Sequence, residues 1–177
     1  MYNSDVMQIP LSQGKVAVVD AGDYENLCGY NWFARRSGNT FYAHRSQDGT
    51  IIAMHREILK PPAGLMCDHK DHNGLNNTRN NLRLCTAAQN QYNQRPQTGG
   101  TSKYKGVYWD ENRRKWRAEI GYGGRLIHIG RFDYETDAAI AYDDRAIELF
   151  GEFAFLNCQC RPEIKKWIEE TYLAYSV

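Results

Sequence analysis

Residues 67–90 read CDHKDHNGLNNTRNNLRLCTAAQN, and this stretch decides the fold of the first half of the chain. Its composition favours short strands over residues 65–70 and 82–85, separated by a long connection rich in Asn. Thr86 is followed three residues later by Gln89, the capping-box pattern with which helices begin. The expected order is therefore strand, long loop, strand, helix, which is a small ββα unit.

Three polar side chains of this stretch suit the hydrolysis of a phosphodiester bond. Asp68 and Asn90 offer one carboxylate and one amide oxygen, and Mg²⁺ uses few protein ligands besides water and substrate phosphate. In a ββα unit the first strand and the helix stand side by side, so both residues can reach one ion. His69 has an ordinary pKa of about 6.5 and can accept a proton near neutral pH. The sequence predicts that a metal ion and a histidine together activate a water molecule.

The same residues resemble the motif of HNH endonucleases, in the subfamily met in phage homing and free-standing nucleases. The resemblance covers roughly residues 55–93. It implies that His69 is the general base, that Asp68 and Asn90 bind the metal, and that Asn81 ties the loop and orients the base. An Asn at the last metal position predicts Mg²⁺ or Mn²⁺ as the cofactor, rather than Zn²⁺.

Several neighbouring residues have alternative interpretations. His72 is either a spare ligand or a loop residue, and His55 resembles an upstream element of the family without an assigned role. Asp71 is expected to cap the loop rather than to bind metal. The five cysteines include no CxxC pair, which favours free thiols over a zinc site. Most of the remaining asparagines are expected to be turn residues: Asn73, Asn76, Asn77 and Asn80.

Positive charge is concentrated after this motif. The net charge is only +1, yet residues 99–132 hold eight Lys and Arg against three Asp and Glu, and residues 133–177 hold four against ten. A basic stretch with interspersed aromatic residues is typical of a polyanion partner, because neutralised phosphates release their counterions. Residues 94–102, QRPQTGGTS, precede this region and read as a linker.

Regular patterns return after the linker. Charged and apolar residues alternate over residues 115–120, as in a half-buried strand, and strands are expected on either side over 104–109 and 126–129. Apolar and small residues follow a helical period over residues 135–150, and Gly151 then suits a C-terminal cap. These elements predict a three-stranded antiparallel sheet packed on one α-helix.

This region resembles the ethylene-response-factor (AP-two) DNA-binding domain over about residues 102–157. The matching segments are KGVY at 105–108, WRAEI at 116–120, HIGRF at 128–132 and AAIAYD at 138–143. That family lays its sheet in the major groove of double-stranded DNA, which admits a β-ribbon. The resemblance and the exposed strand face together give the expected DNA-binding residues: Lys105, Tyr108, Arg113, Lys115, Arg117, Glu119 and His128.

The expected fold class is α+β, with five segments: a β-rich N-terminal region (1–50), a ββα-metal nuclease domain (51–95), a linker (96–102), the DNA-binding domain (103–157) and a C-terminal helix (158–177). The predicted function is metal-dependent DNA cleavage, by default one strand per site. The alternatives are a non-catalytic, sequence-specific DNA-binding regulator and a structural metal-binding or RNA-associated protein. A mean hydropathy of −0.68 and the absence of a signal peptide predict an intracellular, phage- or bacterium-like protein without a membrane partner. The oligomeric state is left open, a monomer included.

Overall fold

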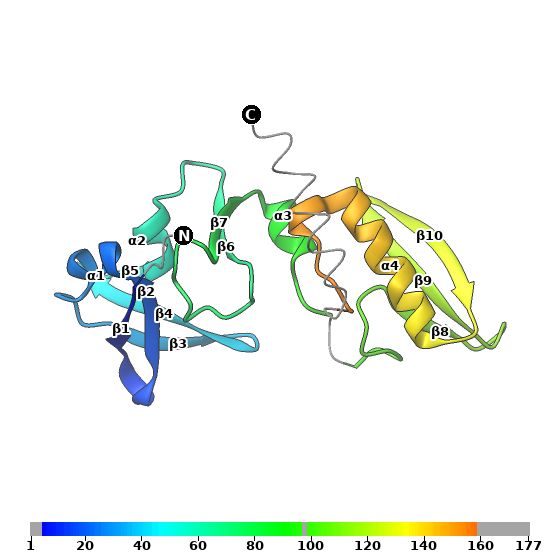
Figure 1. Ribbon diagram of the computed structural model, residues 1–177, viewed down its shortest axis with the longest axis horizontal. Coiled ribbons are helices and arrows are strands. Elements are labelled where there is room, and N and C mark those ends of the chain that lie inside the picture. Colours follow the sequence, from blue (N-terminus) through cyan, green and yellow to red (C-terminus); the bar gives the residue numbers. More distant parts are fainter. Residues whose placement is uncertain (1–4, 97–98, 159–177) are drawn as a thin grey trace. The chain divides into compact units, whose positions relative to one another are not determined.

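The computed structural model describes residues 5–96 and 99–158. The C-terminal helix expected over residues 158–177 lies outside this part, apart from Cys158. The described residues contain four α-helices and four small antiparallel sheets, so the predicted α+β class is confirmed (Figure 1). The chain divides into two compact units, residues 1–90 and residues 91–177.

The first unit is built from three small sheets and three helices. Strands β1 and β2 pair, β3, β4 and β5 form a sheet in that order, and β6 pairs with β7. The sequence predicted β6, β7 and α3, and a β-rich region over residues 1–50. The elements in chain order are β1 (Val6–Pro10), β2 (Val16–Asp20), α1 (Ala21–Leu27), β3 (Phe33–Ser37), β4 (Thr40–Gln47), β5 (Thr50–Ala53), α2 (Met54–Leu59), β6 (Met66–His69), β7 (Leu82–Cys85) and α3 (Ala87–Tyr92).

One hydrophobic core serves the whole first unit. Val19 of β2 and Leu27 of α1 are buried in the same cluster as Met54 of α2 and Leu82 of β7. Residues on both sides of position 50 therefore bury their apolar surface against one another, which couples their folding. The boundary expected at residue 50 runs through this shared core.

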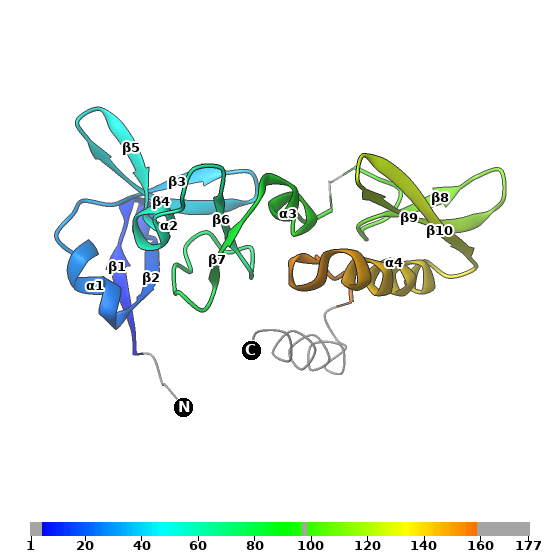
Figure 2. The ribbon, with the colours of Figure 1, turned by 90° about the horizontal axis from the view of Figure 1, so that it is seen from above.

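The second unit is a sheet covered on one face by a helix. Strands β8 (Val107–Asp110), β9 (Lys115–Tyr122) and β10 (Arg125–Phe132) are antiparallel, with β9 in the centre. Helix α4 (Glu135–Phe150) crosses one face of this sheet (Figures 1 and 2). Both the sheet and the helix match the prediction from the sequence.

Small residues allow α4 to lie close to the sheet. Ala138, Ala139 and Ala146 have no exposed surface, and short side chains permit close approach of two backbones. Gly106 has a φ of +72°, and a Cβ there would stand 2.2 Å from the ring of Tyr142. The position before β8 therefore requires glycine both for its backbone conformation and for space.

Candidate active site and nucleic-acid interface

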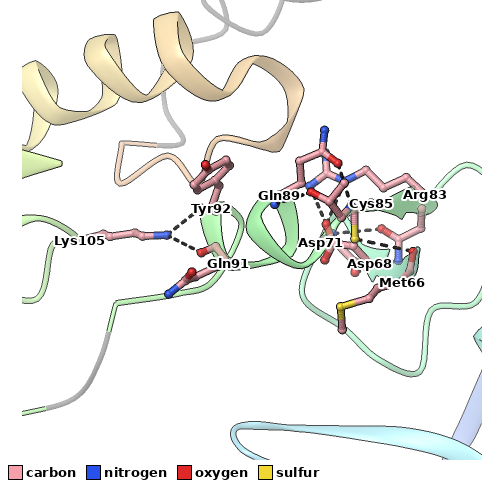
Figure 3. A network of polar contacts seen from close by, with 11 residues as sticks. Met66, Asp68, Asp71, Arg83, Cys85, Gln89, Gln91, Tyr92 and Lys105 are labelled. Atoms are coloured by element: carbon pink, nitrogen blue, oxygen red, sulfur yellow. Dashed lines mark hydrogen bonds and ion pairs between the residues drawn. The ribbon is translucent and has the colours of Figure 1, made fainter. Parts of the chain in front are cut away.

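Asp68 is held by an arginine on the paired strand. The register of β6 and β7 places Asp68 opposite Arg83, whose Nε and Nη2 donate to Asp68 Oδ2 at 2.9 and 2.7 Å. The two side chains are only 8% and 9% exposed. Figure 3 shows the pair beside the start of α3. A buried fork of this kind fixes the orientation of the carboxylate, and the strand pairing was needed to identify Arg83 as its partner.

His69 is buried next to Asp68, and Asn77 contacts its ring. Its Nε2 lies 3.3 Å from Oδ1 of Asn77, while Nδ2 of Asn77 donates to the carbonyl of Gly74. The amide oxygen thus faces the ring, which favours the neutral tautomer with hydrogen on Nε2 and a lone pair on Nδ1. Burial lowers the pKa of His69, although Asn77 and the carboxylates of Asp71 and Asp68 oppose this shift. The lowered pKa favours the neutral imidazole at neutral pH.

Two further rings enclose the imidazole of His69. The ring centroids of Tyr42 and His55 lie 5.6 and 5.1 Å from that of His69, and 5.7 Å from each other. Nδ1 of His55 is buried without a hydrogen-bond partner. Burial, with a smaller contribution from His69, lowers the pKa of His55 to about 3. His55 is therefore a neutral packing partner of His69. Tyr42 is a contact of His69 that the sequence did not predict.

Asn81 organises the loop that follows His69. Its Nδ2 donates to Asp71 Oδ1 at 2.9 Å and to the carbonyl of Asn76 at 2.7 Å, and its Oδ1 accepts from the backbone of Asp71. Asp71 also accepts from the backbone of Asn73, which is the loop-capping role expected of it. Asn81 therefore ties the loop. Nothing in the sequence singles out Asn77 as the contact of His69.

The same loop is attached to the N-terminal strands. The backbone of Val18 in β2 donates to Leu75 and accepts from Asn77, at 2.8 and 2.7 Å. The guanidinium of Arg79 donates hydrogen bonds to both carboxylate oxygens of Asp23, at 2.8 and 2.7 Å. Asn77 has no exposed surface, and its backbone hydrogen bond to Val18 fixes its position next to β2. The N-terminal region thus helps to hold the candidate base.

Asn90 lies on α3, which begins with the predicted capping box. The backbone of Thr86 donates to Gln89 Oε1 at 2.8 Å, and the backbone of Gln89 donates to Thr86 Oγ1 at 3.2 Å. Within residues 5–96 and 99–158, no group of three or more His, Cys, Asp or Glu side chains could hold a metal ion. Asp68 on β6 and Asn90 on α3 thus stay the donors predicted from the sequence. One carboxylate with one amide oxygen fits a hard, largely hydrated ion and does not fit structural zinc.

His72 lies in the loop, and the described cysteines form no disulfide with one another. His72 adopts a φ of +61° within the loop. Within the described part of the chain, Cys28, Cys67, Cys85 and Cys158 are not joined in disulfides, and Cys160 lies outside that part.

The expected DNA-binding residues gather on the sheet face opposite α4. Arg117 of β9 pairs in register with Tyr108 of β8, and Glu119 pairs with His128 of β10. Cross-strand partners project from the same face. Arg117 Nε and His128 Nδ1 lie 3.3 and 3.7 Å from one oxygen of Glu119, so this carboxylate orders the long side chains around it.

Arg131 belongs to this face but was not predicted from the sequence. The register of β10 with β9 places it opposite Arg117, and its Nε lies 3.1 Å from Asp110 Oδ2. Two other predicted residues lie nearby: Arg113 is in the hairpin turn beside Asp110, and Lys115 pairs with Asp133. Ion pairs thus restrain most of the arginines and lysines expected to contact DNA.

Lys105 is placed differently from the other predicted DNA contacts. Its Nζ donates to the carbonyl of Tyr92 at 2.7 Å and more weakly to that of Gln91 (Figure 3). It also donates to the carbonyl of Gln94 at 2.7 Å. Burial lowers its pKa to about 8. The ammonium group therefore caps the C-terminal end of α3, where the last carbonyl groups have no hydrogen-bond partner within the helix.

Comparisons with known proteins agree with both halves of this description. The HNH endonuclease model matches residues 60–92, and the AP2 domain model matches residues 102–152. An uncharacterized HNH endonuclease of Acanthamoeba polyphaga mimivirus is 35% identical over 152 residues, which is 82% of this chain and 76% of that protein. The chain belongs to the HNH endonuclease family.

Other relatives of this HNH endonuclease match parts of it. Protein 3.8 of Escherichia phage T7 is 34% identical over 93 residues, 52% of this chain and 76% of that protein. An AP2-like ethylene-responsive transcription factor of Arabidopsis thaliana is 40% identical over 60 residues, 33% of this chain and 17% of that protein. Both resemblances found in the sequence are confirmed. No helix among the described residues is long and apolar enough to cross a membrane.

Proposed function

We propose that this HNH endonuclease is a metal-dependent phosphodiesterase that cuts one strand of double-stranded DNA per site. The observation that carries the proposal is the adjacent, buried pair Asp68 and His69, in which the carboxylate is held by Arg83 and the imidazole by Asn77. A carboxylate fixed beside an oriented neutral base is what water activation on a phosphodiester requires.

Each residue of the site has a defined part in the proposed reaction. Asp68 and Asn90 would hold the ion, Mg²⁺ or Mn²⁺, which when bound would stabilise the charge that develops on the phosphate and on the leaving oxygen. His69 accepts the proton of the attacking water on Nδ1. Asn77 and Asn81 keep the base and its loop in place. A single set of these groups acts on one phosphate at a time, and this supports nicking.

In this proposal the AP2 domain binds the DNA. Phosphate contacts are proposed for Arg113 and Lys115, and contacts in the major groove for the ordered residues of the exposed sheet face: Tyr108, Arg117, Glu119, His128 and the newly identified Arg131. Lys105 is instead proposed to stabilise the segment after α3, because its ammonium already donates to main-chain carbonyls. Cleavage thus lies before the linker at 96–102 and recognition after it.

Nicking of supercoiled plasmid by the full chain tests the proposal. His69→Ala should abolish nicking in Mg²⁺ while gel-shift binding of the same DNA persists. An exposed histidine on the AP2 sheet provides the converse control, since His128→Ala should weaken binding and leave the chemistry of bound DNA intact. If the wild-type chain binds DNA but never nicks it in Mg²⁺ or Mn²⁺, the protein is the non-catalytic regulator instead.

A further inference from the structure

The sheet face that touches His69 continues to an exposed arginine. In the pairing of β3 with β4, Phe33 lies opposite His44 and Arg35 lies opposite Tyr42. Directly opposed residues project from the same face, with Cβ atoms about 4.5–5.5 Å apart. Tyr42 in turn contacts the ring of His69. Arg35 thus lies next to Tyr42, whose ring packs on the ring of His69.

The electrostatics of this face agree with that placement. Burial lowers the pKa of His44, and Arg35 adds to the shift. Arg35 is exposed, and no carboxylate of the described residues forms an ion pair with it, unlike Arg117, which pairs with Glu119. An arginine held on a strand beside a catalytic base, with its guanidinium available, suits a phosphate, whose oxygens match the planar fork.

The next residue in the chain offers an internal comparison. Arg36 is also exposed, but it lies opposite Phe41 and therefore on the other face of the hairpin. Its Nε donates to the carbonyl of Gly38, and Lys15 stacks on Phe41 from that side. Arg35 and Arg36 thus carry the same charge at adjacent positions, but only Arg35 shares a face with the candidate site.

We propose that Arg35 binds a backbone phosphate of the DNA strand being cut, next to the scissile phosphate, and so gives the nuclease unit a DNA contact of its own. The proposal rests on the proposed function. It implies that the AP2 domain alone does not position the strand for cleavage. The β3–β4 hairpin would place the DNA backbone over His69.

The test compares Arg35→Gln with Arg36→Gln in the full chain, by plasmid nicking in Mg²⁺ over a range of salt concentrations. Loss of one charge-assisted phosphate contact should lower kcat/KM about tenfold or more. The slope of log kcat/KM against log salt should become shallower by about 0.9, the value for one phosphate. Arg36→Gln should stay within about twofold of wild type, as surface substitutions usually do. Arg35→Lys should keep the wild-type salt slope because it keeps the charge, but it should recover only part of the rate because it lacks the planar fork.

Two results would overturn the inference while the proposed function stands. In the first, Arg35→Gln nicks as fast as wild type with the same salt slope. In the second, both glutamine variants lose the same activity, which would indicate a general charge effect. If the wild-type chain itself does not nick, the proposed function fails, and this inference fails with it.

Discussion

Replacing Asn77 by alanine should uncouple the candidate base from the strand that holds it. The side chain is fully buried, and its Oδ1 accepts from His69 Nε2 at 3.3 Å. Alanine leaves that N–H buried without an acceptor, at a cost of about 1–3 kcal/mol. If that cost falls entirely on the transition state, the rate falls about 5- to 150-fold. Loss of comparable supporting hydrogen bonds in metal sites costs about 10- to 100-fold, so we expect a decrease within this range.

The assay is the single-turnover nicking rate of supercoiled plasmid by wild type, Asn77→Ala, His69→Ala and the double variant. DNA affinity should not change, because the AP2 domain holds the DNA in our proposal. If Asn77 acts through His69, its removal should have no further effect once His69 is alanine. Asn77→Asp keeps an acceptor for Nε2 and should recover much of the rate.

A nicking rate of the double variant below that of His69→Ala would contradict a role of Asn77 that acts through His69. If Asn77→Ala lowered the residual rate of His69→Ala by the same factor as it lowers the wild-type rate, Asn77 would support the fold of the loop rather than the base. Melting temperatures of all four proteins distinguish a lost fold from a lost contact.

Four further predictions follow from the geometry. Arg83→Met should raise the Mg²⁺ concentration needed for half-maximal nicking by about 10- to 100-fold, because Asp68 loses its fork. The acidic limb of the rate–pH profile should lie below pH 6.5, since the pKa of His69 is lowered; a limb above pH 7 would contradict this. His55 has a folded pKa of about 3, below its value of about 6.5 in the unfolded chain, so unfolding takes up a proton between these values and stability falls as pH falls from 6.5 towards 3. His55→Phe should lose less stability between pH 7 and 5 in urea titrations. Lys105→Met should lower the melting temperature but leave the salt dependence of DNA binding unchanged, whereas a shallower slope would restore Lys105 as a phosphate contact.

Local patterns in the sequence were sufficient where neighbouring residues determine the structure. The capping box of Thr86 and Gln89 begins α3 as predicted, since its hydrogen bonds join residues three apart. Helix α4 has the predicted limits, because an alanine stripe and a following glycine specify it locally. The exposed face of β9 likewise follows from simple alternation.

Contacts between distant segments were not predictable in this way. Asn77 stands among several asparagines that suit turns equally well, and only the backbone bonds with Val18 select it for burial. Arg83 is identified by strand register, and Tyr42 by the packing of an N-terminal sheet against the motif. Strands β1 and β3 are short and largely exposed, with one buried residue each, so they lack a strong period.

The motif alone does not determine which groups Lys105 contacts. Its position in the AP2 resemblance predicts a DNA contact, but the same side chain can equally donate to carbonyl groups of its own chain. The segment after α3 supplies those carbonyls, and the sequence around Lys105 contains no sign of them.

The most direct test of the account is the nicking of supercoiled plasmid by the purified full chain with Mg²⁺ or Mn²⁺, and with EDTA in place of the metal. Metal-dependent cleavage at Asp68 and His69 predicts open-circular product with either metal and none with EDTA. Nicking in EDTA, or no nicking with either metal, would contradict metal-dependent hydrolysis at Asp68 and His69.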